Sequence, residues 1–391
     1  MIDSQLNEVS KFVHVRPSPN PSDLNVWCNG NDYQADSLDL KIHQELIDFA
    51  KFLAPSPIEK HIRLLAINKY RTAISLIWPD AKMICHGSTA TTTNLPDSDL
   101  DFVVFNAPTN QDDISLLRHL EDNLLEKKII RNSKVINARC PIIKCTDNIY
   151  GFNVDIAVNN ENGILNIKRH NMYMKEYPGI FPVLMFTKFF LRQHHLDTPY
   201  DGGISSNTLI QMIIFIIQML DKSERLNCGK ILLKFLLYYG GSFNYITTGI
   251  STREGGRTFE KLKLYRVNWS TPVCLSIEDP QIPGNFLGEN AFNTYTFRQK
   301  CSDGYLKLIS SKSFYEQSLL NRLINHITLR SMSKFRKSIL DKFISICGNL
   351  ISSLPDEESA LVRRHNAQPK NSYNKEVRYN FTNYKKPPYK R

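Results

Sequence analysis

The chain has 391 residues, 42% of them hydrophobic, and a formal net charge of +11. This length allows two domains with separate cores, and the positive charge favours an anionic partner such as nucleic acid. We expect no membrane partner, because the longest apolar run, residues 209–220, is too short to span a bilayer. The eight cysteines show no CxxC spacing and the N-terminal residues lack the pattern of a secretory signal, so free thiols in the nucleus or cytosol are expected.

The first elements along the chain are expected to be an irregular leader and two helices. Residues 1–36 are polar and carry closely spaced prolines, which predicts irregular structure. Apolar residues at helical spacing predict a helix over 38–53. Ser56 and Glu59, with a proline in the first turn, form the signature of a capping box, and a second helix is predicted from there to Trp78.

The next segment is predicted to form a sheet covered by one helix. Strands are expected over 81–86, 99–105, 134–145 and 150–158, with an amphipathic helix over 112–128. Because strands and helices are mixed and mostly non-parallel in order, the pattern indicates an α+β fold rather than a doubly wound sheet.

The second half of the chain is predicted to be mainly helical. Helices are expected over 183–194, 205–220, 230–239, 311–327 and 331–350, with weaker, β-like sequence over 242–277. The basic, tyrosine-rich segment 353–391 is predicted to be disordered. Contact with single-stranded RNA, a solvated tail and a localisation signal are all compatible with that composition.

Two aspartates open the second strand of the predicted sheet. In Asp99-Leu100-Asp101 the strand period of two places both carboxylates on one face. They repel each other unless a cation lies between them, and carboxylate oxygens are ligands that Mg²⁺ selects. The turn Gly87-Ser88, just before them, offers N–H groups and a hydroxyl to phosphate oxygens. A metal beside a phosphate cradle predicts phosphoryl or nucleotidyl transfer.

Taken alone, these features are ordinary, since an Asp-x-Asp pair is most often a solvated strand end and Gly-Ser is a common turn. A third carboxylate changes this interpretation. Asp155 lies on the opposite face of its strand from Val154 and Ile156, where an unpaired carboxylate would be costly to bury. The set Asp99, Asp101 and Asp155 matches the two-metal arrangement, with ions about 4 Å apart, used for displacement at phosphorus.

These motifs resemble those of nucleotidyltransferases of the DNA polymerase beta superfamily. The segments Trp78-Pro79-Asp80-Ala81 and Leu95-Pro96-Asp97-Ser98-Asp99-Leu100-Asp101 are more similar to one branch, the non-canonical poly(A) polymerases of the TRAMP type and their terminal uridylyltransferase cousins. The similarity runs from about residue 38 to about residue 310.

The resemblance implies a polymerase beta-like palm domain and a helical central domain that form a cleft between them. It assigns the N-terminal helix, residues 37–55, to the central domain. The catalytic domain would cover 56–165 and the rest of the central domain 166–352. The leader at 1–36 and the tail at 353–391 would flank them.

The resemblance also implies nucleotide contacts. The Gly87 N–H and Ser88 would hold phosphate, and Asn166 falls where the family contacts the ribose. Lys188 and Arg192, one helical turn apart, fall where the family binds the triphosphate with basic residues. Outside that context, Asn166 is equally well a helix cap, and the two cations are ordinary helix-surface residues.

Two further segments complete the implied site. Ser206, at a helix start, would bind phosphate, and Asn207 stands where relatives place an aromatic ring that stacks on the base. Asn285 lies in a loop resembling the nucleotide-recognition loop, where adenylating members carry Asn, and this favours ATP. Glu289 replaces the arginine usual in that loop. His170 has no metal-ligand spacing with its neighbours and is interpreted as structural or exposed.

By resemblance, the expected reaction is untemplated transfer of AMP from ATP to an RNA 3′-hydroxyl, with Mg²⁺ or Mn²⁺ held by Asp99, Asp101 and Asp155. The implied partners are a zinc-knuckle RNA-binding protein and an exosome-associated RNA helicase. The implied location is the nucleus, with the cytoplasm as the alternative. Two other functions stay open: a terminal uridylyltransferase, and an inactive RNA-processing scaffold suggested by Asn207 and Glu289.

Overall fold

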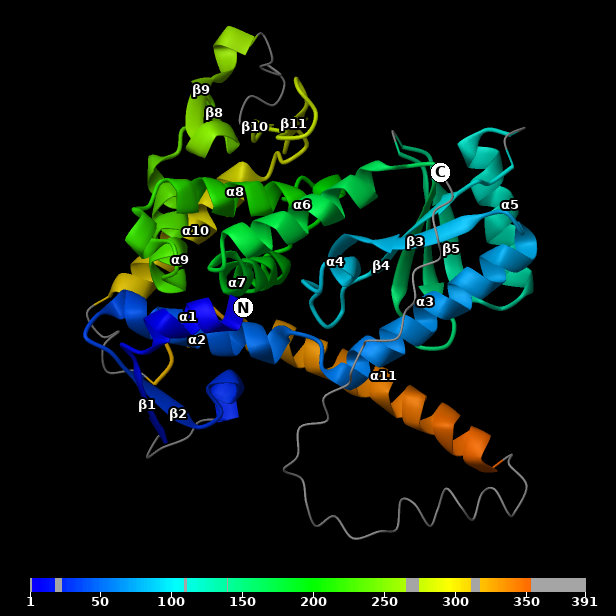
Figure 1. Ribbon diagram of the computed structural model, residues 1–391, viewed down its shortest axis with the longest axis horizontal. Helices are drawn as coiled ribbons and strands as arrows, with labels where there is room; N and C mark the ends of the chain where they lie inside the picture. Colours follow the sequence, from blue (N-terminus) through cyan, green and yellow to red (C-terminus); the bar gives the residue numbers. More distant parts are fainter. Residues whose placement is uncertain are drawn as a thin grey trace, which may run out of the picture. The chain divides into compact units, whose positions relative to one another are not determined.

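The computed structural model describes residues 2–17, 23–108, 111–138, 140–264, 274–310 and 317–352 (Figure 1). Residues 1–340 form one compact unit and residues 341–391 a second. The predicted tail at 353–391 lies outside the described residues. Across the described part of the chain, no helix combines the length and apolar character needed to cross a membrane.

A five-stranded sheet organises the segment that carries the aspartates. β4 and β7 run parallel, and the other neighbouring pairs run antiparallel. This mixed sheet, with helices beside it, confirms the predicted α+β class. In spatial order the strands are β3 (Lys82–His86), β4 (Leu100–Phe105), β7 (Asn153–Val158), β6 (Ile142–Asp147) and β5 (Ile130–Ile136).

Two helices pack on this sheet. α3 (Pro57–Ile77) begins with the predicted capping box, in which Ser56 Oγ accepts from the Glu59 N–H and the Glu59 carboxylate accepts from the Ser56 N–H. α5 (Asp113–Glu126) turns its buried leucines toward the sheet and contacts β5, β6 and β7. Figure 1 shows both helices beside the strands.

The helical part packs around two almost wholly apolar helices, α7 and α8, which match the segments predicted over 183–194 and 205–220. Its helices are α2 (Leu38–Leu53), α6 (Asn162–Glu176), α7 (Ile180–Gln193), α8 (Ser206–Gln218), α9 (Cys228–Leu237), α10 (Thr294–Ile309) and α11 (His326–Ser352). The β-like sequence expected over 242–277 contributes strands to a small sheet with the order β11-β10-β8-β9. Its strands are β8 (Thr248–Ser251), β9 (Arg257–Glu260), β10 (Ile277–Glu278) and β11 (Phe286–Leu287).

Residues 1–36 are not the irregular leader that we expected. Trp27 and Tyr33 are buried, and Trp27 Nε1 donates to Glu45 of α2 at 3.0 Å. These contacts give an otherwise polar segment a fixed place on the helical core. Its elements are α1 (Ile2–Ser10), a 3-10 helix (Asp23–Cys28), and an antiparallel pair of strands, β1 (His14–Pro17) and β2 (Asn31–Gln34).

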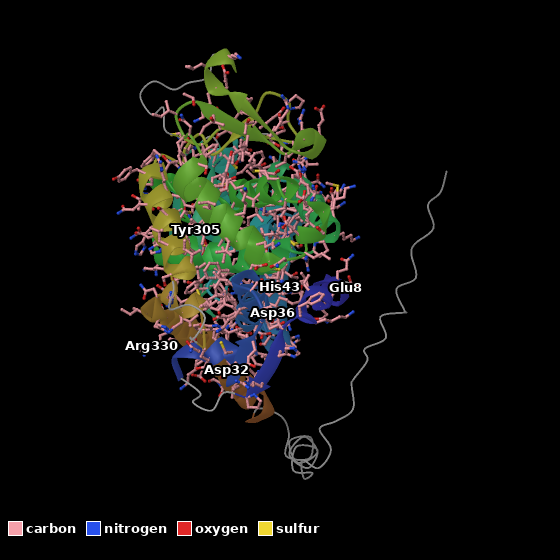
Figure 2. The ribbon with its side chains drawn as sticks, turned by 90° about the vertical axis from the view of Figure 1, so that its left-hand side faces the viewer. Glu8, Asp32, Asp36, His43, Tyr305 and Arg330 are labelled. Atoms are coloured by element: carbon pink, nitrogen blue, oxygen red, sulfur yellow. The ribbon has the colours of Figure 1, made fainter. Side chains whose placement is uncertain are left out.

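Helix α2 joins this N-terminal segment to the rest of the helical part. His43, labelled in Figure 2, accepts a hydrogen bond at Nδ1 from the Cys228 N–H of α9 at 3.1 Å. The carboxylate of Glu45 accepts from the Leu319 N–H at 2.8 Å and from the Leu320 N–H at 3.1 Å. The side chains of His43 and Glu45 are both fully buried, so α2 lies inside the helical core.

Two other sequence predictions were wrong. The strand expected over 134–145 is interrupted, because β5 ends at Ile136 and β6 begins at Ile142, after Pro141, which has no N–H to give to a ladder. Of the helix expected over 311–327, residues 311–316 lie outside the described part of the chain, and residues 317–325 hold one 3-10 helix (Leu320–Arg322) in place of an α-helix. The domain limits at 37–55, 56–165 and 166–352 stay predictions, since residues 1–340 cluster as one unit.

Candidate active site

The strand register brings acidic residues of separate segments together in one row across the sheet. Asp101 of β4 lies opposite Asp155 of β7, although 53 residues separate them in the chain. Directly opposed residues of neighbouring strands share a face. The row continues from His86 on β3, through the two aspartates, to Lys144 on β6 and Lys134 on β5.

The charges of this row are strongly coupled. Burial, together with the charges of Asp155 and Asp99, raises the pKa of Asp101 to about 7. Burial also raises the pKa of Asp155, against the opposing effect of Lys144, whose Nζ lies 3.4 Å from Asp155 Oδ2. Carboxylates that raise each other's pKa are stabilised by a cation placed between them.

The donor chemistry of Asp99, Asp101 and Asp155 fits a hard divalent cation, because all three are carboxylates and the pKa of Asp101 and of Asp155 stays raised despite the nearby lysines. They do not form a closed cage. Among the described residues, no three His, Cys, Asp or Glu side chains are already arranged around one point. Asp155 in particular is paired with Lys144. Lys144 would therefore compete with a bound ion for Oδ2 of Asp155.

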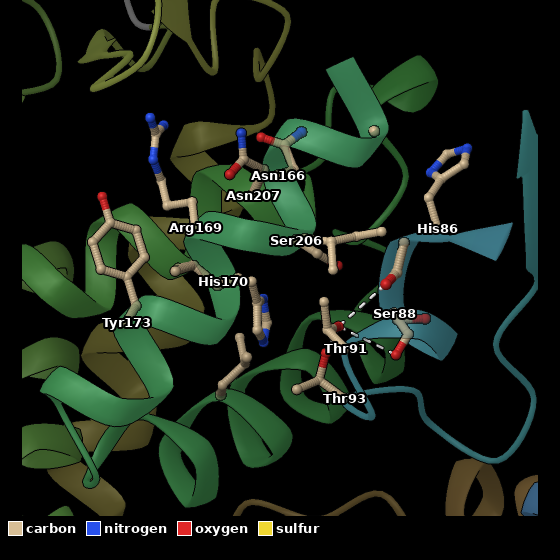
Figure 3. Close-up of a pocket in the computed structure, with 15 residues that line it drawn as sticks. His86, Ser88, Thr91, Thr93, Asn166, Arg169, His170, Tyr173, Ser206 and Asn207 are labelled. Atoms are coloured by element: carbon tan, nitrogen blue, oxygen red, sulfur yellow. Dashed lines mark hydrogen bonds between the residues drawn. The ribbon is translucent and has the colours of Figure 1, made fainter. Parts of the chain in front are cut away.

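Gly87 is required by the geometry next to Asp101. Its φ is +63°, and a Cβ there would lie 2.1 Å from Asp101 Oδ2. Only a glycine allows the backbone to pass so close to the carboxylate. The predicted turn is a short helix, α4 (Gly87–Ala90), and Thr91 Oγ1 donates to the carbonyl oxygens of Gly87 and Ser88 (Figure 3).

Two adjoining cavities, of about 130 and 250 Å³, open beside this row and share Ser88 and Ser206. The smaller cavity contains predicted site residues Gly87, Asn166 and Asn207 in its wall (Figure 3). Predicted site residues in the wall of the larger cavity are Asp99, Asp101, Lys188 and Arg192. The structure therefore brings together most of the residues that the sequence singled out.

Lys188 and Arg192 lie one turn apart on α7, as predicted, and each already has partners. Lys188 is 8% exposed and its Nζ donates to the Thr93 carbonyl at 2.8 Å. Burial and, to a lesser degree, the charge of Arg192 together lower the pKa of Lys188 to about 8. Arg192 pairs with Asp97 at 2.8 Å and with Asp197. Both cations face the larger cavity.

Ser206 and Asn207 begin helix α8. The preceding Ser205 caps the helix, with its Oγ accepting from the Thr208 N–H at 3.1 Å. This cap leaves the Ser206 side chain free to line both cavities, while Asn207 lines only the smaller one. The amide of Asn207 thus stands at the position where a ring was expected from the resemblance.

Asn285 and Asp155 are the two predicted site residues that line neither cavity. Asn285 Nδ2 donates to Asp279 Oδ2 at 2.8 Å. The other oxygen of Asp279 lies 3.5 Å from Arg169 Nη1, and Arg169 lines the smaller cavity. Among the described residues, Asp279 and Arg169 therefore connect the Asn285 side chain to the cavity.

The sequence did not identify His170 as a site residue. It is not exposed, as one of the two interpretations had it, because only 8% of it is accessible, and it lines the smaller cavity. The signal was present: Gly163, Asn166, His170 and Tyr173 recur at helical spacing and all line the cavity from α6. Gly163 is itself required, since a Cβ there would lie 2.6 Å from His86 Nδ1.

Comparison with known proteins gives two family matches. Residues 42–175 match the family described as "Poly(A) RNA polymerase, mitochondrial-like, central palm domain", and residues 227–285 match the family described as "Cid1 family poly A polymerase".

Among similar curated proteins, Poly(A) RNA polymerase cid14 of Schizosaccharomyces pombe is 29% identical over 72% of this chain and 42% of its own length. Poly(A) RNA polymerase CID14 of Cryptococcus neoformans is 32% identical over 74% of this chain and 39% of its own length. The "Inactive non-canonical poly(A) RNA polymerase protein Trf4-2" of Drosophila melanogaster is 30% identical, with 68% of each chain covered. The chain thus spans about two fifths of the length of the first two relatives.

Solved structures give the same fold. The polymerase core of TRAMP, described as an RNA surveillance complex, matches with a TM-score of 0.65 and 25% identity, over 74% of this chain and 94% of that chain. The Cid1 poly(U) polymerase matches with a TM-score of 0.60 and 19% identity, over 72% of this chain and 97% of that chain.

Proposed function

This chain belongs to the family of non-canonical poly(A) RNA polymerases, and we propose that it is a template-independent RNA nucleotidyltransferase that adds AMP from ATP to RNA 3′ ends in RNA surveillance or decay. The observation that carries this proposal is the pairing of Asp101 with Asp155 across parallel strands, directly beside the Gly87 backbone and a cavity lined by Lys188. Acidic and basic groups for phosphoryl chemistry meet there in one place.

Asp99, Asp101 and Asp155 would hold the divalent ions, Mg²⁺ or Mn²⁺. Bound there, the ions would neutralise charge at the reacting phosphate and lower the pKa of the attacking hydroxyl. In the reaction the RNA 3′-oxygen forms a bond to the α-phosphorus of ATP, the bond from that phosphorus to the β-phosphate oxygen breaks, and pyrophosphate leaves.

In this proposal, different parts of the nucleotide bind in the two cavities. Ser88 and Ser206, which line both, together with Lys188 and Arg192 in the larger one, would hold the triphosphate. Asn166, in the smaller cavity, would contact the ribose, since an amide both donates to and accepts from hydroxyls. The Gly87 N–H with phosphate and Asn207 on the base side complete the direct contacts in this set. Asn285 would act on the base side through Asp279 and Arg169, because it lines neither cavity.

The acceptor RNA would approach from the other end of the cross-strand row. His86 lines the nucleotide cavity, whereas Lys144 and Lys134 extend the row beyond Asp155 on β6 and β5 and are exposed. Two lysines on this face offer charge to a phosphate backbone without reading its bases. This placement would bring the last phosphates of the acceptor close to the aspartates.

The partners and the location are part of the proposal. The likeness to the polymerase core of TRAMP supports assembly with a zinc-knuckle RNA-binding protein and an exosome-associated RNA helicase, and a nuclear location. A second candidate function, an inactive RNA-processing scaffold, is favoured by one observation: a relative that is 30% identical is itself named inactive. The presence of all three aspartates, with Asp101 directly opposite Asp155, supports the enzyme.

Incubation of the protein with an RNA oligonucleotide, Mg²⁺ or Mn²⁺, and each of the four nucleoside triphosphates separately tests this proposal. We expect 3′ extension with ATP as the preferred substrate, lost in Asp101→Asn. Clear preference for UTP would identify a uridylyltransferase instead. No extension with any nucleotide and either metal would favour the scaffold.

A further inference from the structure

His170 has a polar atom that no described residue satisfies. Its Nε2 is buried and has no hydrogen-bond partner, although 92% of the residue is shielded from solvent. Buried polar side-chain atoms are nearly always paired, because an unpaired one loses its water without compensation. The ring points into the smaller cavity in Figure 3. A group that enters this cavity is therefore the natural partner of Nε2.

The state of the ring restricts what that group is. Burial, with the charge of Lys188 as a lesser cause, lowers the pKa of His170 to about 4. The imidazole is then neutral at pH 7, with one nitrogen that donates and one that accepts. A neutral ring has no charge to offer a phosphate, whereas a hydroxyl can match either nitrogen.

The position of His170 points to the sugar rather than to the triphosphate. Ser88 and Ser206 mark the side of the cavity shared with the aspartates and Lys188, and His170 lines only the smaller cavity. His170 also follows Asn166 by four residues on α6, so the two side chains are neighbours on one helix face, about 6 Å apart at Cβ. Adjacent hydroxyls of one sugar can be reached by both residues.

We propose that His170 is a specificity residue for ribonucleotides, whose Nε2 forms a hydrogen bond with a ribose hydroxyl of the incoming nucleotide beside Asn166. This inference rests on the proposed function of the site. It assigns to His170 a direct contact with substrate, and it predicts that the residue contributes to discrimination against deoxynucleotides. A site built to bond a hydroxyl discriminates against an analogue that lacks it, since its own polar atom is then left unpaired.

The test compares ATP, 2′-deoxy-ATP and 3′-deoxy-ATP in single-addition rates, for wild type, His170→Leu and His170→Gln. His170→Leu removes both nitrogens, while His170→Gln keeps a donor and an acceptor near the position of Nε2. We expect His170→Leu to lower kcat/KM for ATP about tenfold, and to leave it within about twofold for one of the deoxy analogues. His170→Gln should restore much of the advantage of ATP over that analogue.

Equal losses for all three nucleotides in His170→Leu, or no loss for any, would overturn the inference. Ile167→Val, on the same face of α6, is the packing control, and its ratio of ATP to deoxy-ATP should match wild type. Calorimetric binding of the three nucleotides without RNA gives a readout independent of turnover. If wild type extends no RNA, the proposed function fails, and the binding ratios still decide whether His170 contacts a ribose hydroxyl.

Discussion

Gly87 and Asp101 approach each other so closely that a Cβ at residue 87 would lie 2.1 Å from Asp101 Oδ2. The φ of +63° at Gly87 adds a second constraint, because residues with a Cβ are strained there. The backbone that precedes Ser88 and the carboxylate at the centre of the acidic row therefore fix one another in place.

Gly87→Ala should abolish most RNA extension while the protein stays folded, because the new methyl group must displace the Asp101 carboxylate. We expect a loss of kcat of about 100-fold or more, the size found for a misplaced catalytic group. Gly241→Ala is the matched control, since a Cβ there meets nothing within 4 Å. Normal extension by Gly87→Ala would show that the position of Asp101 is unimportant.

The raised pKa of Asp101 predicts a dependence of metal binding on pH. Between the ordinary carboxyl pKa and about 7, the folded protein holds a proton that the unfolded chain has lost, so stability without metal falls as pH rises through this range. A divalent ion must displace that proton, and its affinity should rise from pH 6 to pH 8. Titration of Mn²⁺ at several pH values measures this. Asp101→Asn should bind weakly at every pH, and a flat profile in wild type would contradict the account.

Lys144→Ala should weaken RNA binding more than ATP binding, because Lys144 lies on the side of Asp155 away from the nucleotide cavity. Losing one phosphate contact should reduce the dependence of log K on log salt by about one unit of slope. Lys82→Ala, an exposed lysine at the start of β3, serves as the control. A change in KM for ATP alone, with RNA affinity unaltered, would place Lys144 in the nucleotide site.

Glu45→Ala should destabilise the fold without changing the chemistry of the site. Its fully buried carboxylate accepts from Trp27 Nε1, from Ser318 Oγ and from the N–H groups of Leu319 and Leu320. Leaving these donors unpaired should lower the free energy of unfolding by about 3 kcal/mol. Urea denaturation measures the change.

The control for that experiment is Glu8→Ala, since Glu8 is exposed at the surface (Figure 2). It should change the free energy of unfolding by less than about 0.5 kcal/mol. Equal effects of the two substitutions would mean that the buried carboxylate does not hold residues 318–320 against α2.

Arg336→Met should loosen the junction between α2 and α3. The guanidinium donates to the carbonyl oxygens of Phe52, Leu53 and Ala54 at 2.7–2.8 Å, and its Nε lies 2.9 Å from Glu59 Oε1. We expect a loss of about 2–4 kcal/mol in thermal or urea unfolding, because several buried acceptors lose their donor. Arg330→Met, at an exposed position of the same helix, should have little effect. Similar stability of both variants would contradict this role.

The sequence allowed the acidic cluster to be predicted because its signal is local. Strand alternation places Asp99 and Asp101 on one face, and the apolar neighbours of Asp155 fix its face too. What alternation cannot give is which strands are neighbours. The strand order depends on long-range packing. It alone places Asp155 opposite Asp101 and Lys144 opposite Asp155.

Other features depend on partners that are distant in the chain and therefore could not be predicted. Trp27 donates to the Glu45 carboxylate, and the same carboxylate accepts from the Leu319 N–H. Asn285 lies outside both cavities because Asp279 takes its amide. His170 is on a recognisable helix face, but its burial and unpaired nitrogen appear only when α6 packs beside the turn at 87–93.

The central claim is that Asp155, from a separate strand, acts with Asp99 and Asp101 in nucleotidyl transfer. The most direct measurement is the rate of a single AMP addition to RNA by Asp155→Asn, with Asp80→Asn as an exposed control. The account predicts a loss of about 1,000-fold or more for Asp155→Asn, with ATP still bound, and a wild-type rate for the control. Addition of AMP by Asp155→Asn at a rate near that of wild type would contradict it.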